Sequence, residues 1–173
     1  MKNPLKKEYL NLYKEKAGGG YEFTGTYYRF QGQSFQKRFF LLAAVLGAIG
    51  ALIVASGCLN AGGMRNSFYV IIPYIGEISA CFALAWNAFK LLTKGERVKD
   101  YVYKTAYPRL PRIALAVAIF AGISFVCSLV FILLQGAEGG VLGCVLYLAF
   151  KLSIALTAIL FRDLIIKTKY EAE

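Results

Sequence analysis

Histidine is absent from this 173-residue chain, and the other side chains that usually carry enzyme chemistry are few. Without histidine, a His-ligated haem is excluded and zinc and copper lose their commonest nitrogen ligand. Aspartate occurs only at Asp100 and Asp163, and no nucleophile motif or phosphate-binding loop is present. We therefore expect a non-enzymatic protein that needs no metal and no cofactor. The cysteines are far apart, with no Cys-x-x-Cys pair, which argues for small apolar filler rather than a disulfide-exchange centre: Cys58, Cys81, Cys127 and Cys144.

What the sequence does hold is long apolar runs. Hydrophobic residues make up 58% of the chain, and the mean hydropathy is +0.53. A helix needs about 20 apolar residues to cross the ~30 Å hydrocarbon core of a bilayer. Four stretches are long enough: 39–59, 68–92, 113–135 and 140–161. The sequence thus predicts an all-α integral membrane protein with four transmembrane helices in residues 39–162, a leader (1–38) and a short tail (163–173).

The formal net charge of +10 is distributed as a topology signal. Lysine and arginine crowd the leader, the connection between the second and third spans, and the tail, whereas the other two connections hold only Arg65 and Glu138 as charged residues. The positive-inside rule then places both termini and the middle connection in the cytoplasm. This distribution favours the anionic inner leaflet of a bilayer as a partner, and it argues against nucleic acid.

The leader predicts two small elements on the cytoplasmic side. Residues 3–16 carry apolar side chains at helical spacing and predict an amphipathic helix, which lies on the membrane or a partner, or packs on its own loops. Residues 21–30 alternate aromatics around a glycine-containing turn and predict a hairpin with two facing pairs. The helix face consists of Leu5, Tyr9, Leu12 and Tyr13, and the hairpin pairs are Phe23 with Tyr28 and Tyr21 with Phe30.

The middle connection predicts a third cytoplasmic element. Residues 96–105 are basic and suit a helix along the membrane surface, and Pro108 and Pro111 are expected to end this helix before the third span. With the leader, this connection offers the surfaces that a cytoplasmic partner would contact.

Two charges stand inside apolar spans: Glu77 in the second and Lys151 in the fourth. A charge at the centre of a spanning helix costs roughly 2.5–3.5 kcal/mol. Both spans are predicted to run from outside to inside, which puts Glu77 roughly 13 Å and Lys151 roughly 16 Å deep at 1.5 Å per residue. At nearly equal depth, the two side chains can pair and relieve much of both penalties.

Three roles are open for these two charges. They can lock the bundle, form a polar site or proton-coupled pathway, or meet a complementary charge on another subunit. Tyr74 and Tyr147 lie one turn from Glu77 and Lys151 respectively, either as hydrogen-bond partners of a small site or as packed aromatics. Pro73, one turn before Glu77, removes a helix hydrogen bond and favours a bend.

Small residues recur every four positions in the first and third spans. Such a stripe lets a neighbouring helix approach closely, either within the bundle or between copies of it. The stripes are Ala43, Gly47, Ala51 and Ala55, and Ala114, Ala118 and Gly122.

Taken together, these features predict a non-enzymatic accessory or scaffold subunit of a membrane complex. The short outer connections, the basic cytoplasmic elements and the small-residue seams suit a protein that works by contact with another membrane protein or a second copy. The alternative is a small transporter or channel, oligomeric or not, with Glu77, Lys151, Tyr74 and Tyr147 in its pathway.

Overall fold

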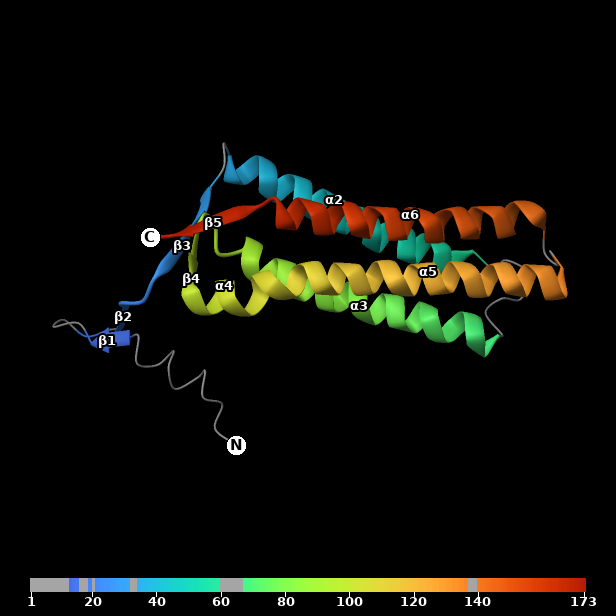
Figure 1. Cartoon of the computed structure of the whole chain (residues 1–173), viewed down its shortest axis with the longest axis horizontal. Coiled ribbons are helices and arrows are strands. Elements are labelled where there is room, and N and C mark those ends of the chain that lie inside the picture. Colours follow the sequence, from blue (N-terminus) through green and yellow to red (C-terminus); the bar gives the residue numbers. More distant parts are fainter. Residues whose placement is uncertain (1–12, 16–18, 20, 32–33, 60–66, 137–139) are drawn as a thin grey trace, which may run out of the picture.

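Four long helices that run side by side form the main body of the structure (Figure 1). The structure is a computed structural model that describes residues 13–15, 19, 21–31, 34–59, 67–136 and 140–173. Each long helix is of sufficient length and apolar character to cross a membrane, which confirms the prediction of four spans. They are α2 (Phe35–Cys58), α3 (Phe68–Leu92), α5 (Leu110–Gln135) and α6 (Val141–Ile166).

Helices α2 and α6 extend beyond the apolar runs from which they were predicted, and polar contacts stabilise these extensions. Ser34 caps α2, and its Oγ accepts a hydrogen bond from the Lys37 backbone N–H at 3.4 Å. At the end of α6, Arg38 Nη2 donates to the Leu164 carbonyl at 3.1 Å. Terminal N–H and C=O groups of a helix need partners, so such contacts let these helices continue into polar sequence.

The helices pack unequally. α5 lies against both α3 and α6, and α6 also lies against α2, whereas α2 and α3 make few contacts with each other. Each helix contributes fully buried apolar side chains to the common core, among them Ile49, Leu84, Val117 and Ile154. The sparse packing between α2 and α3 leaves one side of the bundle open.

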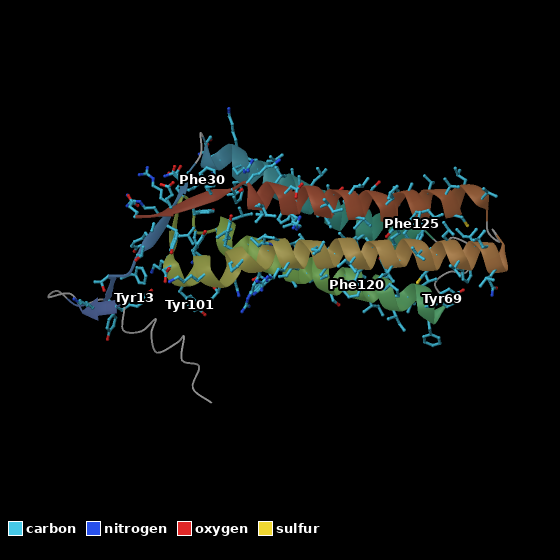
Figure 2. All side chains as sticks on the ribbon, in the orientation of Figure 1. Tyr13, Phe30, Tyr69, Tyr101, Phe120 and Phe125 are labelled. Atoms are coloured by element: carbon cyan, nitrogen blue, oxygen red, sulfur yellow. The ribbon has the colours of Figure 1, made fainter. Side chains whose placement is uncertain are left out.

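The outer surface of the bundle is apolar along its length. Carbon dominates the side chains along the helices, while nitrogen and oxygen gather near one end (Figure 2). Large hydrophobic side chains on this surface include Phe68, Phe82 and Leu133, which are 80%, 74% and 75% exposed. Such a surface is costly in water and is satisfied by lipid, which agrees with a multi-pass membrane protein.

A small sheet at one end of the bundle joins segments that are far apart in sequence. The central strand β3 (Tyr27–Gln31) pairs antiparallel with β4 (Arg97–Lys99) on one side and with β5 (Lys169–Ala172) on the other. The leader, the middle connection and the tail therefore meet at the same end (Figure 1).

The predicted hairpin over residues 21–30 is wrong. β2 (Tyr21–Phe23) and β3 are both strands, but β2 pairs with β1 (Tyr13–Glu15) and β3 pairs with β4 and β5. For β3, the central position of a three-stranded sheet satisfies both hydrogen-bonding edges, whereas the predicted hairpin would leave one edge unpaired. The longer-range pairing therefore prevails over the local turn.

The predicted amphipathic helix over 3–16 is also wrong at its C-terminal end. Tyr13–Glu15 forms strand β1, in register with Tyr21–Phe23. The remainder of the predicted helix lies outside the described residues. The β1–β2 pairing places Tyr13 against the buried Phe23, whose ring centroid lies 5.4 Å from that of Tyr13 and 5.2 Å from that of Tyr27.

In the middle connection, the prediction of one helix over residues 96–105 that two prolines end is wrong. The first part of this connection is strand β4, followed by α4 (Asp100–Ala106), the 3₁₀ turn η2 (Tyr107–Arg109) and then α5. Helical backbone continues through Pro108 and Pro111, because each stands in a first turn, where its missing N–H has no partner to lose.

Stacked tyrosines fasten the sheet to the bundle. The Tyr103 ring lies 4.1 Å from that of Tyr28, 4.8 Å from that of Tyr107 and 5.5 Å from that of Tyr170. The Tyr107 hydroxyl donates to the Thr168 carbonyl at 2.6 Å, between α6 and β5. Burial, with smaller contributions from Tyr107 and Tyr103, raises the pKa of Tyr170 to about 12.

Candidate functional site

Glu77 and Lys151 meet in the interior of the bundle. Lys151 of α6 donates from Nζ to Oε2 of Glu77 on α3 at 2.8 Å, and both side chains are 0% exposed. Since two buried charges are tolerated only when they are paired and hydrogen-bonded, this contact offsets a large part of their desolvation. The pair ties α3 to α6, two helices that each pack on α5.

Two tyrosine rings complete the surroundings of the ammonium group. The ring centroid of Tyr74 lies 4.2 Å from Lys151 Nζ and that of Tyr147 lies 5.2 Å away. The face of an aromatic ring attracts a cation, by about 2 kcal/mol when the cation is desolvated. Both tyrosines therefore lie beside the charge pair, and they approach Lys151 through their rings. Pro73 is buried in α3 one turn before Glu77.

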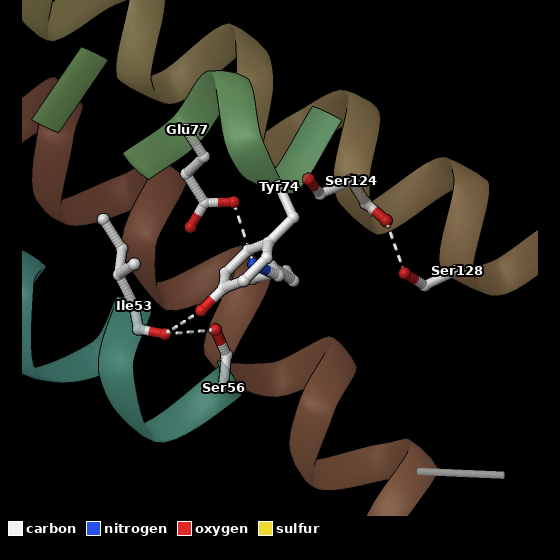
Figure 3. Close-up of polar contacts among 7 residues, drawn as sticks. Ile53, Ser56, Tyr74, Glu77, Ser124 and Ser128 are labelled. Carbon is white, nitrogen blue, oxygen red and sulfur yellow. Dashed lines mark hydrogen bonds and ion pairs between the residues drawn. The ribbon is translucent and has the colours of Figure 1, made fainter. Parts of the chain in front are cut away.

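The hydroxyl of Tyr74 connects the charge pair to α2. It donates to the Ile53 carbonyl at 3.0 Å, and Ser56 Oγ donates to the same carbonyl at 2.8 Å (Figure 3). Gly57 makes this contact feasible, because a Cβ at this position would overlap the Tyr74 hydroxyl. A glycine at 57 is therefore required by the close approach of α3 to α2.

Two oxygen atoms beside the pair remain without a good hydrogen bond. Ser124 of α5 lies close to the Glu77 carboxylate, yet neither its Oγ nor Glu77 Oε1 forms a hydrogen bond within the described part of the chain. Ser128 Oγ donates at 2.6 Å to the Ser124 backbone carbonyl and so does not satisfy either atom (Figure 3). At these two oxygen atoms the site could still form hydrogen bonds.

The space around the pair is small. A cavity of about 30 Å³ lies beside the two tyrosines that contact Lys151, with Ser56, Tyr74 and Tyr147 among its lining residues. This volume holds a water molecule but no organic solute. The described residues also contain no group of three side chains suited to bind a metal ion.

A larger hollow opens on the side where α2 and α3 diverge. Its part nearer the charge pair has a volume of about 280 Å³ and includes Tyr74 in its wall. Its part nearer the sheet has a volume of about 610 Å³ and includes Trp86. Leu46, Phe82 and Ala85 line both parts, so we treat them as one apolar groove, here called the α2–α3 groove.

The two small-residue stripes have different surroundings. In α5, Ala114 and Ala118 are buried in the core and Gly122 is half-buried. In α2, Ala43 and Gly47 line the α2–α3 groove, Ala51 is exposed and Ala55 is half-buried. A Cβ added at Gly47 would meet no atom within 4 Å. The stripe of α2 is thus largely uncovered, while the first two residues of the α5 stripe serve packing within the bundle.

Several residues of the site have no counterpart among the predicted ones. Ser56 and Ser124 could have been identified from the sequence, since a hydroxyl group in an apolar span needs a hydrogen-bond partner. The Ile53 carbonyl and Gly57 could not have been identified from the sequence, because their importance depends on where Tyr74 lies.

Comparison with known proteins adds no relative to this description. No protein-family model, no curated protein and no solved structure matches the chain.

Proposed function

We propose that this protein is a non-enzymatic accessory subunit of a membrane complex, which receives a transmembrane helix of a partner protein in the α2–α3 groove. The observation that carries the proposal is the groove itself: an apolar, laterally open surface next to an ion pair that is sealed from solvent.

The length of the groove suits a spanning helix. Along α3 its lining runs from Tyr74 to Thr93, which corresponds to roughly 28 Å at 1.5 Å per residue. The hydrocarbon core of a bilayer is ~30 Å thick. The α2 wall includes the small residues Ala43 and Gly47, which allow a helix backbone to approach closely there, and the α3 wall presents aromatic rings.

The ion pair acts in this proposal as the structural support of the groove. It holds α3 to α6, and the hydrogen bond from Tyr74 to Ile53 holds α3 to α2 at the closed end of the groove. The walls are therefore fixed before a partner arrives, which lowers the cost of binding.

In the proposed orientation the sheet end faces the cytoplasm, with both termini on that side. The leader, the middle connection and the tail carry most of the basic residues, and all three contribute strands to the sheet. The positive-inside rule favours this orientation.

The test compares two leucine substitutions on α2. Gly47→Leu fills the groove, whereas Ala48→Leu adds the same bulk at the next position, which is exposed and outside the groove lining. Tagged chains are extracted from native membranes in a mild detergent, and co-purifying proteins are identified. We expect a stoichiometric membrane protein with the wild type and with Ala48→Leu, and its loss with Gly47→Leu. Recovery of the chain alone, or with copies of itself only, would refute the proposal.

A second candidate is a small transporter or channel that uses Glu77 and Lys151. Glu77 Oε1 and Ser124 Oγ favour it, since neither has a hydrogen-bond partner among the described residues and they could accept or donate a proton or contact a water. Flux of protons or small ions through vesicles reconstituted with the purified chain tests it. Flux that disappears with Glu77→Gln would support this candidate, and vesicles as tight as protein-free ones would eliminate it.

A further inference from the structure

A basic pocket lies at the sheet end of the bundle, where the first turn of α2 meets the last turn of α6. Its volume is about 410 Å³, and its lining includes two hydroxyl groups, on Ser34 and Thr168. Three cationic side chains also line it, Lys37, Arg38 and Lys167.

These three cations have no counter-charge among the described residues. No carboxylate in that part of the chain lies within ion-pair distance of any of them. Two other cations at the same end do form ion pairs: Arg97 with Glu173 at 3.0 Å and Lys104 with Asp100 at 2.9 Å. The pocket is therefore a local concentration of unpaired positive charge.

Arg38 is held in position before any ligand binds. Its Nε donates to Thr168 Oγ1 and its Nη2 to the Leu164 carbonyl, both at 3.1 Å. A guanidinium group has five N–H donors, so the contacts in the described chain leave donors available for an anion. Planar, fixed guanidinium groups are well suited to phosphate.

The position of the pocket relative to the apolar spans identifies the source of that phosphate. The pocket lies at the N-terminus of α2, whose dipole favours an anion. Leu41, one turn further along α2, lines the pocket as well and is 43% exposed. A phosphate in this pocket would thus lie at headgroup level, with an apolar path directly beneath it.

We propose that this pocket binds the phosphate headgroup of an anionic phospholipid, with the acyl chains passing Leu41 along α2. The lipid would bridge α2 and α6 through Lys37, Arg38 and Lys167. This inference does not depend on the α2–α3 groove or on its occupant, because the two sites share no lining residue.

Native mass spectrometry of the purified full-length chain, titrated with dioleoyl-phosphatidylglycerol or dioleoyl-phosphatidylcholine, tests the proposal. The variant Lys37→Gln/Lys167→Gln removes two exposed pocket lysines and leaves the partly buried hydrogen bonds of Arg38 intact. The matched control Lys90→Gln/Lys94→Gln removes the same charge from exposed positions at the sheet end of α3. Glycerol 3-phosphate is added as a competitor that has the phosphate but no acyl chains.

We expect the wild type to bind the anionic lipid at least about tenfold more tightly than the neutral one. The pocket variant should lose roughly 30-fold in affinity, the effect of two lysines near an anionic surface, and the control less than about threefold. Equal affinity for the two lipids, or equal losses in both variants, would overturn the proposal. Displacement of the lipid by glycerol 3-phosphate would also overturn it, because the site would then be one for a soluble phosphate.

Discussion

Removing one member of the Glu77–Lys151 pair should destabilise the bundle far more than removing both. Each single variant, Lys151→Met or Glu77→Gln, leaves a charge at a position that is 0% exposed. The folded chain can avoid the unpaired charge by neutralising it. At pH 7 this costs about 3.7 kcal/mol for a carboxyl group of ordinary pKa (~4.3) and about 4.6 kcal/mol for an ammonium group of ordinary pKa (~10.4). Both values agree with the ~3–5 kcal/mol expected for breaking a buried pair.

The double variant Glu77→Gln/Lys151→Met should recover most of this loss. It buries no charge, although it gives up the contacts of the ammonium group with the rings of Tyr74 and Tyr147. We expect its free energy of unfolding to lie within about 2 kcal/mol of the wild type. The coupling energy of the double-mutant cycle should then exceed about 3 kcal/mol.

The two single variants should respond to pH in opposite directions. In Lys151→Met the surviving carboxyl group must be protonated to fold, so acidification from pH 7 should reduce the deficit by about 1.4 kcal/mol per pH unit. In Glu77→Gln the surviving ammonium group must lose its proton, so the deficit should shrink as the pH rises above 7. This opposition would not arise from a simple packing defect.

Equilibrium unfolding of the purified chain in mixed micelles, as dodecyl sulfate is added, gives these free energies. The exposed charges of Lys94 and Glu96 provide controls: Lys94→Met and Glu96→Gln should stay within about 0.5 kcal/mol of the wild type at every pH. A double variant as unstable as the worse single variant would show that the reasoning about the pair is wrong.

Two further predictions concern contacts that position the site and the sheet. Gly57→Ala should cost about 1–3 kcal/mol, because its Cβ would displace the Tyr74 hydroxyl from the Ile53 carbonyl. In the same unfolding assay the control Gly50→Ala should leave the free energy of unfolding nearly unchanged, because no atom lies within 4 Å of the added Cβ. Adding Tyr74→Phe to Gly57→Ala should restore the lost stability, because it removes the hydroxyl that the new Cβ meets. A loss that Tyr74→Phe does not relieve would contradict this explanation. Because the pKa of Tyr170 is raised from 10.0 to about 12, its stabilising contribution is complete below pH 10 and declines as the pH rises to 12. Thermal unfolding over this range should show a decline of about 2–3 kcal/mol that is absent in Tyr170→Phe, and parallel curves for the two proteins would count against it.

The membrane spans could be read from the sequence because hydropathy is a local property. The apolar run 68–92 coincides with α3 (Phe68–Leu92). Counting residues along two spans also placed Glu77 and Lys151 at similar depth, since an α-helix has a fixed rise. Which helices adjoin was not encoded locally: the contact between α3 and α6 depends on the packing of both against α5.

The sheet could not be predicted, because its pairing is long-range. Tyr28 of β3 is paired with Val98 and with Ala172, and none of these strands exceeds five residues. The local hairpin rule used neighbouring residues and therefore chose the wrong partner strand. The sequence of β5, Lys169–Ala172, alternates polar and apolar residues over only four positions, and this pattern does not indicate which strand it pairs with.

The orientation of Tyr74 shows the same limit within the site. Its spacing from Glu77 correctly placed it on that face of α3. The sequence does not reveal that its ring covers Lys151 while its hydroxyl reaches Ile53 on α2. That arrangement requires space at Gly57, which a one-dimensional pattern does not show.

Photo-crosslinking in native membranes tests the proposed accessory function most directly. A photoreactive residue at Phe82 reports from the α2–α3 groove, and one at Ile119, an exposed position of α5 outside the groove lining, serves as the control. We predict that Phe82 crosslinks to one distinct membrane protein and that Ile119 does not. Crosslinks from Phe82 to lipid alone, or to a second copy of this chain, would contradict the account.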